Sequence, residues 1–103
     1  MATAISGTTA VTANTDTTLL NVAAGKQATC TVNVCNRGTS DATVRIALSA
    51  TATPATSEYI EYDVVVPASG VLERGGLVRP ASTYIVVRSS STSVSFNYWG
   101  FQE

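Results

Sequence analysis

The side chains best suited to chemistry in this sequence are three acids close together, Glu58, Glu61 and Asp63. On one strand face Glu61 and Asp63 would lie about 7 Å apart. Two carboxylates at that distance can act as acid and base on a glycosidic bond, or ligate a hard cation. The same spacing fits a solvated face opposite Ile60 and Tyr62, and no substrate-binding loop lies nearby. We therefore interpret the cluster as surface.

Other routes to catalysis lack a partner residue. Serine and threonine are abundant, but the chain has no histidine to activate a hydroxyl. Gly75-Gly76 is not followed by the helix start that a phosphate-binding loop requires. Cys30 and Cys35 would lie about 16 Å apart on one strand, too far for a disulfide, and a zinc site would need two further ligands. We expect no enzyme, no cofactor and no catalytic or metal-binding residue.

Apolar residues recur with a period of two along most of the chain, which is typical of strands with one buried face. The clearest runs are Cys30–Val34, Val44–Leu48, Ile60–Val64 and Val94–Tyr98. Together they predict an all-β fold, a single antiparallel β-sandwich of seven to eight strands, jelly-roll-like or immunoglobulin-like. The cysteine–tryptophan–cysteine spacing of true immunoglobulin domains is absent, which favours the jelly roll slightly.

The chain divides near residue 16. Residues 1–16 are rich in threonine and alanine and predict an N-terminal arm, ordered on docking to a partner, or an edge strand. Residues 17–103 predict the β-sandwich domain.

Turn residues inside this domain predict how neighbouring strands connect. We expect two hairpins, Gln27–Cys35 with Ala42–Ser49 and Thr83–Arg88 with Val94–Phe101. Gly75-Gly76 predicts a bulge or corner. In the strand before Pro67, the alternating pattern predicts an inward set of Ile60, Tyr62, Val64 and Val66.

The charge content limits which classes of partner we expect this protein to bind. Six lysines and arginines are scattered singly among seven acids in 103 residues, so no basic stripe exists and we expect no nucleic-acid partner. No apolar stretch is long enough for a membrane helix, so we expect no membrane partner, and the N-terminus does not resemble a secretory signal. Low charge makes a surface easy to desolvate, which favours a subunit covered by other subunits.

Several apolar side chains are expected on the outward face of their strands, where a surface should be wet. They predict a second buried face and a homo-oligomer, most simply a homotrimer. Trp99 or Phe101 either anchors a subunit contact or helps to close the core. The candidate subunit or capsid contacts are Tyr59, Val65, Tyr84, Val86, Trp99 and Phe101.

From Thr18 to Glu103 the sequence resembles small structural proteins of tailed-bacteriophage virions. The segments that carry the resemblance are Val34–Gly38, Val44–Leu48, Tyr59–Asp63, Gly70–Arg74, Ile85–Ser89 and Tyr98–Phe101. Such proteins are typically β-sandwich modules, often trimeric, that decorate and cement capsids or build tail and neck parts. The resemblance implies a protein made in the host cytoplasm and located in the virion, without enzymatic activity.

On this basis the expected function is capsid decoration, with the major capsid protein or another virion structural protein as partner. One compact module without a fibrous repeat favours decoration over a tail, neck or fibre-associated role. A carbohydrate-binding or adhesion module is the alternative from another class. The direction in which Trp99, Tyr59 and Tyr84 point, towards a subunit seam or an open groove, discriminates between these classes.

Overall fold

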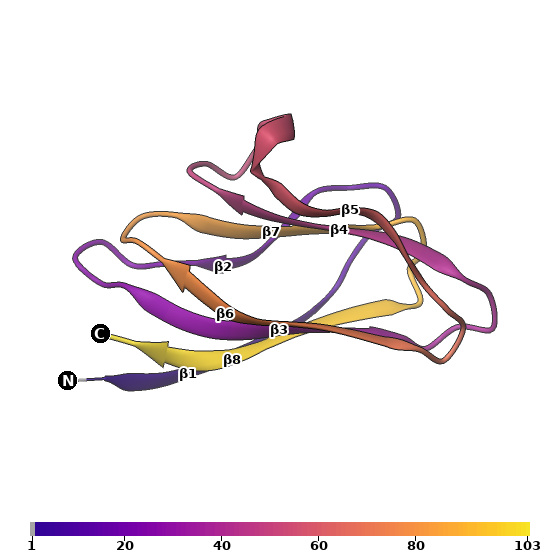
Figure 1. Ribbon diagram of the computed structural model, residues 1–103, viewed down its shortest axis with the longest axis horizontal. Helices are drawn as coiled ribbons and strands as arrows, with labels where there is room; N and C mark the ends of the chain where they lie inside the picture. The colour runs from indigo at the N-terminus through magenta and orange to yellow at the C-terminus, as the bar shows by residue number, and fades with distance from the viewer. Residues whose placement is uncertain (1) are drawn as a thin grey trace.

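The computed structural model describes residues 2–103, which form two four-stranded antiparallel sheets packed face to face (Figure 1). Sheet A has the order β1-β8-β3-β6 and sheet B the order β2-β7-β4-β5. The elements are β1 (Thr3–Ala10), β2 (Thr17–Asn21), β3 (Ala28–Asn36), β4 (Ala42–Ser49), the 3₁₀ turn η1 (Thr56–Glu58), β5 (Tyr59–Val66), β6 (Val71–Arg79), β7 (Tyr84–Ser89) and β8 (Val94–Gln102). The predicted antiparallel β-sandwich is confirmed.

The strand order identifies the sandwich as a jelly roll. The pairs β4·β5, β3·β6, β2·β7 and β1·β8 are nested, as in one long hairpin whose tip lies at η1. Rolling up that hairpin brings β8 beside β3 and β7 beside β4, which completes both sheets. The pairing thus decides between the two topologies that the sequence left open.

Both predicted hairpins are wrong, although their strands exist. β3 pairs with β6 and β8 in sheet A, whereas β4 pairs with β5 and β7 in sheet B. Likewise β7 and β8 belong to different sheets. Alternation shows which face of a strand is buried, but it does not show which strand is the neighbour, and a short polar loop can cross between sheets as well as turn within one.

Asn36 shapes the crossing from β3 to β4. Its side chain is fully buried, and its Nδ2 donates to the carbonyl oxygens of Ser40 at 2.9 Å and Val66 at 3.0 Å. Its Oδ1 accepts from the Gly38 amide at 2.9 Å. These bonds satisfy the backbone of a buried corner and direct the chain to sheet B.

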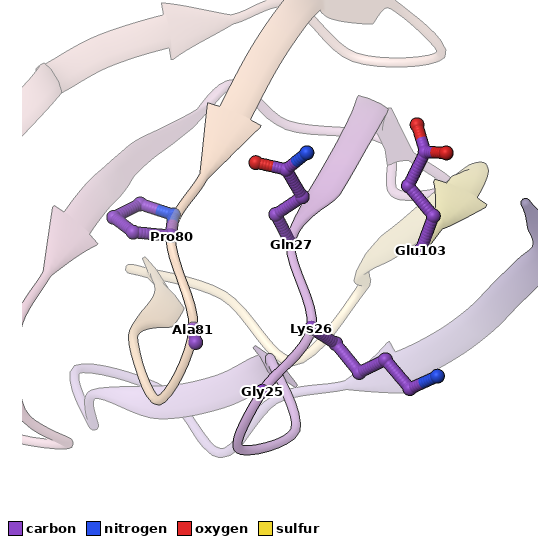
Figure 2. A pocket seen from close by; sticks show the side chains of 6 residues that line it. All are labelled: Gly25, Lys26, Gln27, Pro80, Ala81 and Glu103. Carbon is purple, nitrogen blue, oxygen red and sulfur yellow. The ribbon is translucent and has the colours of Figure 1, made fainter.

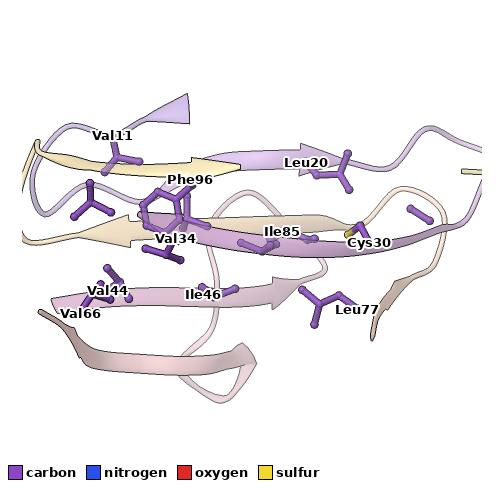
Figure 3. Close-up of a cluster of buried hydrophobic side chains, with 14 of the residues drawn as sticks. Val11, Leu20, Cys30, Val34, Val44, Ile46, Val66, Leu77, Ile85 and Phe96 are labelled. Atoms are coloured by element: carbon purple, nitrogen blue, oxygen red, sulfur yellow. The ribbon is translucent and has the colours of Figure 1, made fainter. Parts of the chain in front are cut away.

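The core lies between the sheets and is drawn mainly from β3, β4, β7 and β8 (Figure 3). Burial alternates along β3 and β8, whereas β4 buries Ile46 and Ala47 in succession and β7 buries three residues in a row, Ile85 to Val87. Burying one such side chain stabilises the fold by about 1.5–3 kcal/mol. The central members are Val32, Val34, Val44, Ile46, Ile85, Val87, Val94 and Phe96, all at most 1% exposed.

The bulge predicted at Gly75-Gly76 is present. Both glycines lie opposite Thr31, because the register of β3 against β6 shifts between Cys30 and Val32. Gly76 has φ of 69°, a left-handed backbone that glycine adopts without strain. The bulge resets the alternation, so that Leu77 is buried while Val78 is 62% exposed.

A second bulge overturns the prediction that Tyr62 faces inward with Ile60, Val64 and Val66. Asp63 has φ of 53°, and the register of β4 against β5 shifts between Val44 and Ile46. The extra residue interrupts the alternation, and Tyr62 is 53% exposed. The other three do contribute to the core.

Candidate functional site

The outer face of sheet A exposes large apolar side chains of β6 and β8, in register with small uncharged residues of β1 and β3. Ala4 of β1, Phe101 of β8, Thr29 of β3 and Val78 of β6 form one cross-strand row. Phe101 is 59% exposed and Val78 62%. Trp99, 45% exposed, pairs with Thr31 in the adjoining row. We call this surface the platform and define it as Ala4, Thr29, Thr31, Val78, Trp99 and Phe101.

No charged residue belongs to the platform. Charges begin further along the same face, where Glu73 lies opposite Asn33 and the Arg37 Nε donates to the Ser95 hydroxyl at 2.6 Å. An uncharged surface of aromatic rings, valine and threonine methyl groups is desolvated at low cost, because no ion loses its water.

A hollow of about 420 Å³ adjoins the other end of the platform (Figure 2). It lies where β3 begins and where β6 and β8 end, and its lining includes Lys26, Gln27, Pro80 and Glu103. The backbones of Gln27 and Glu103 hold this end together through two hydrogen bonds of 2.8 and 2.9 Å. No aromatic ring lines this hollow, but Phe101 is exposed nearby on β8, two residues before Glu103, so polar groups and an aromatic ring adjoin at this end of the sheet as in sites that bind a sugar or a peptide.

The outer face of sheet B is built differently. Arg45 makes a bidentate ion pair with Asp63, with distances of 2.7 and 3.2 Å, and its guanidinium carbon lies 4.1 Å from the centre of the Tyr62 ring. The hydrogen bond from Arg45 lowers the pKa of Asp63 and raises that of Arg45. Tyr59 meets Tyr62 edge to face at 5.2 Å. The rings of Tyr59 and Tyr62 therefore lie against the charged side chain of Arg45.

Tyr59 also covers the middle of sheet B. Its hydroxyl reaches Asp16 at 3.4 Å, just before β2, although Tyr59 itself belongs to β5. Between these two strands lie Ala47 of β4 and Val86 of β7, paired with each other and both 0% exposed. Burial raises the pKa of Tyr59, and the charge of Asp16 raises it further. Arg88 lies 3.7 Å from the same carboxylate.

These contacts correct the predicted contact set. Val86 is buried within its own chain, so it is no exposed candidate for a subunit seam. Tyr59 and Tyr84 are partly buried on sheet B, and Val65 is 56% exposed there. Trp99 and Phe101 are exposed together on sheet A, so the aromatic candidates divide between opposite faces of the molecule.

The sequence reasoning missed Val78 and Thr29 as neighbours of Phe101. Val78 follows the glycine bulge, so the sequence pattern around it does not show a regular strand. The signal that could have located it is the bulge itself, because one extra residue turns Val78 outward.

The acidic cluster is separated in the structure, which corrects the expectation of one shared face. Asp63 pairs with Arg45, whereas Glu61 lies opposite the core residue Ile46 and is 3.4 Å from Arg74 on the other sheet. The bulge at Asp63 places the two carboxylates beside different arginines. Within residues 2–103, no group of three or more potential metal-ligating side chains comes together.

Glu58 has a structural role. Its carboxylate accepts hydrogen bonds from the amides of Ala55 at 2.8 Å and Ala50 at 2.9 Å and from the Ser49 hydroxyl at 3.0 Å. These bonds lower the pKa of Glu58, the one from Ala55 most, and they keep the carboxylate ionised while it closes the loop before β5.

Both cysteines are free, and they lie in different environments. Cys30 is buried in the core, and burial raises the pKa of its thiol. Cys35 is partly exposed and lies opposite Val71 on β6 and Ser95 on β8. A buried thiol with a raised pKa is a weak nucleophile.

No protein-family model and no curated protein matches this chain. Among the residues that the structure describes, none forms a helix long and apolar enough to cross a membrane.

Proposed function

We propose that this protein is a non-enzymatic structural subunit of a phage virion, which binds the outside of the assembled capsid and stabilises it as a decoration protein. The observation that carries the proposal is the platform, which combines three large exposed apolar side chains with no charge. The proposed virion location rests on the resemblance read from the sequence of residues 18–103, and no comparison with known proteins adds to it. The protein is made in the host cytoplasm and functions in the particle.

A capsid lattice suits this kind of surface. Contacts made by one flat face of a small module are individually modest, but a lattice repeats its binding site many times over the particle. Linked or clustered copies then bind with a raised effective concentration, so that weak contacts hold firmly. The major capsid protein is the partner that we propose, and another virion structural protein of the tail or neck is the alternative.

The platform also supports a second candidate function, carbohydrate binding. Phe101 is exposed two residues before Glu103, which lines the hollow, and Trp99 is exposed in the next row along the same face. Sugars stack on aromatic rings and accept hydrogen bonds from amide and ammonium groups. In this reading the two rings hold a glycan, and capsids play no part.

Particles assembled without the protein test the first proposal. They are expected to form but to lose their contents at a lower temperature, and added protein should restore resistance. In co-sedimentation with bare capsids, Trp99→Ser and Phe101→Ser should each weaken binding at least tenfold. Val65→Ser is the matched control, because Val65 is 56% exposed on sheet B, and it should bind like the wild type.

Other outcomes would redirect the assignment. Co-sedimentation with tails alone would support the tail alternative. Retardation of the wild type in a gel containing polysaccharide, lost in Trp99→Ser, would support carbohydrate binding. Equal loss of capsid binding in Val65→Ser and Phe101→Ser would contradict the role of the platform.

A further inference from the structure

The four edge strands of the sandwich differ in how they are protected from other chains. β1 and β6 border sheet A, and β2 and β5 border sheet B. The free backbone groups of an edge strand can pair with another chain, and proteins prevent this with charges, prolines, bulges or short strands. Three of the four edges carry such protection, and β1 does not.

The protected edges are each irregular. β6 contains the Gly75-Gly76 bulge directly after two charged residues. β5 has two register shifts against β4 and carries Glu61 and Asp63. β2 has only five residues and one register shift against β7. A regular ladder with a second chain would be interrupted on each of them.

β1 is long, regular and uncharged. Its eight residues, TAISGTTA, pair with β8 without a register shift and include no charged residue and no proline. No described strand pairs with its other side. β2, next to it in the second layer, also lacks charge, so this side of the sandwich contrasts with the β5–β6 side, where Arg74 and Glu61 pair.

We propose that β1 pairs antiparallel with β1 of a second copy of this chain, joining two sheets A into one continuous eight-stranded sheet. An antiparallel strand is complementary to itself across a two-fold axis perpendicular to the sheet. With Ser6 or Gly7 opposite its own copy, seven residues of each strand pair and form about six to eight hydrogen bonds, somewhat fewer than the roughly ten of a typical protein interface. No like charges meet along the ladder.

The pairing ends at two copies. It uses the one unprotected edge of each chain, and the remaining edges are bulged, short or charged. The proposed assembly is therefore a dimer, which differs from the homotrimer expected from the low charge and the apolar outward positions in the sequence. The inference stands apart from capsid binding, because it uses the backbone edge of β1 and not the outward side chains of the platform, to which β1 contributes only Ala4. In such a dimer the two platforms lie on the same side of the joined sheet.

Charge at the middle of β1 provides the test. Ser6 is exposed, and with the axis at the strand centre it lies directly opposite its own copy or, where Gly7 is opposite Gly7, diagonally across the ladder from it on the same face. Ser6→Lys and Ser6→Glu each place like charges together across the axis. Val71→Lys is the matched control, because Val71 is 62% exposed on β6, the opposite edge strand of the same sheet.

Sedimentation equilibrium of the full chain at micromolar concentration measures the mass of the oligomer that each variant forms. The wild type and Val71→Lys are expected at twice the chain mass of 10.7 kDa. Ser6→Lys and Ser6→Glu alone should dissociate at least tenfold more readily, while an equimolar mixture should form the mixed dimer, which also shows that both variants fold. A monomeric or trimeric wild type would overturn the proposal, as would dissociation of Val71→Lys alone or a mixture that stays monomeric.

Discussion

The two outer faces of this sandwich treat their aromatic residues in opposite ways. On sheet B, Tyr59 lies between the ring of Tyr62 and the carboxylate of Asp16 and keeps Ala47 and Val86 from water. On sheet A, Trp99 lies between Ser6 and Thr31 and Phe101 lies between Ala4 and Thr29, and both rings remain about half exposed.

The difference comes from charged partners. A tyrosine hydroxyl can be anchored by a carboxylate, and an arginine can cover a ring, so sheet B closes its apolar surface within one chain. The platform rows contain no such group. An aromatic residue predicted to face outward therefore indicates a binding surface only where its neighbours cannot cover it.

The largest effect is expected from removing the cover on sheet B. Tyr59→Ser should lower the free energy of unfolding by about 2 kcal/mol, because it exposes Ala47 and Val86 and removes the ring. Urea unfolding followed by tryptophan fluorescence measures this. Tyr59→Phe, which keeps the ring and loses the contact with Asp16, is the control and should lose less than half as much. Equal losses would mean that the hydroxyl, and not the ring, protects this face.

The second-largest effect is expected from acid, which should lower the stability that the ion pair on sheet B provides. The pKa of Asp63 is held below its ordinary value of 3.8 by Arg45, so its contribution to stability is present above that value and is lost as the pH falls through the lower folded pKa. Urea midpoints measured from pH 6 to pH 2 should decrease for the wild type mainly below pH 4. The urea midpoint of Asp63→Asn should decrease less, since the contribution of the lowered pKa of Asp63 is then missing while that of Glu58 remains. Parallel curves for the two proteins would contradict a stabilising ion pair.

A smaller effect is expected from the platform. Phe101→Ser should change the free energy of unfolding by no more than about 0.5 kcal/mol, because the ring is 59% exposed and covers little within its own chain. The same urea titration used for Tyr59→Ser compares the two faces directly. A loss as large as that of Tyr59→Ser would show that the platform belongs to the fold as much as sheet B does.

The smallest perturbation is a thiol label. The reactivity of Cys30 and Cys35 towards it compares the accessibility of the core with that of the outer face of sheet A. In the native protein Cys35 should react with Ellman's reagent, and Cys30 should react only after unfolding, because it is buried with a raised pKa. The denatured, non-reduced protein should show two thiols per chain. Loss of both, with the mass of an internal disulfide, would contradict the strand geometry. Protection of Cys35 by bound capsids would show that the bound surface extends along sheet A.

Much of the secondary structure followed from local pattern. Alternating residues located β3, β4 and β8, because one buried face requires an apolar residue at every second position. Gly75-Gly76 marked its bulge because only glycine adopts that backbone freely. The bulge at Asp63 has no such marker in the sequence, so the orientation of Tyr62 and the partners of Glu61 and Asp63 were not predictable from it.

The sequence alone determined that the chain builds a β-sandwich, that it has no histidine and that its charge is low, because these are properties of residue type and period. Only the tertiary structure decided which strands are neighbours, since a crossing loop and a hairpin loop have similar composition. It also decided that Val86 is covered while Phe101 is not. That outcome depends on side chains from β5 and from the residue before β2 meeting over β4 and β7, a contact between segments more than 40 residues apart.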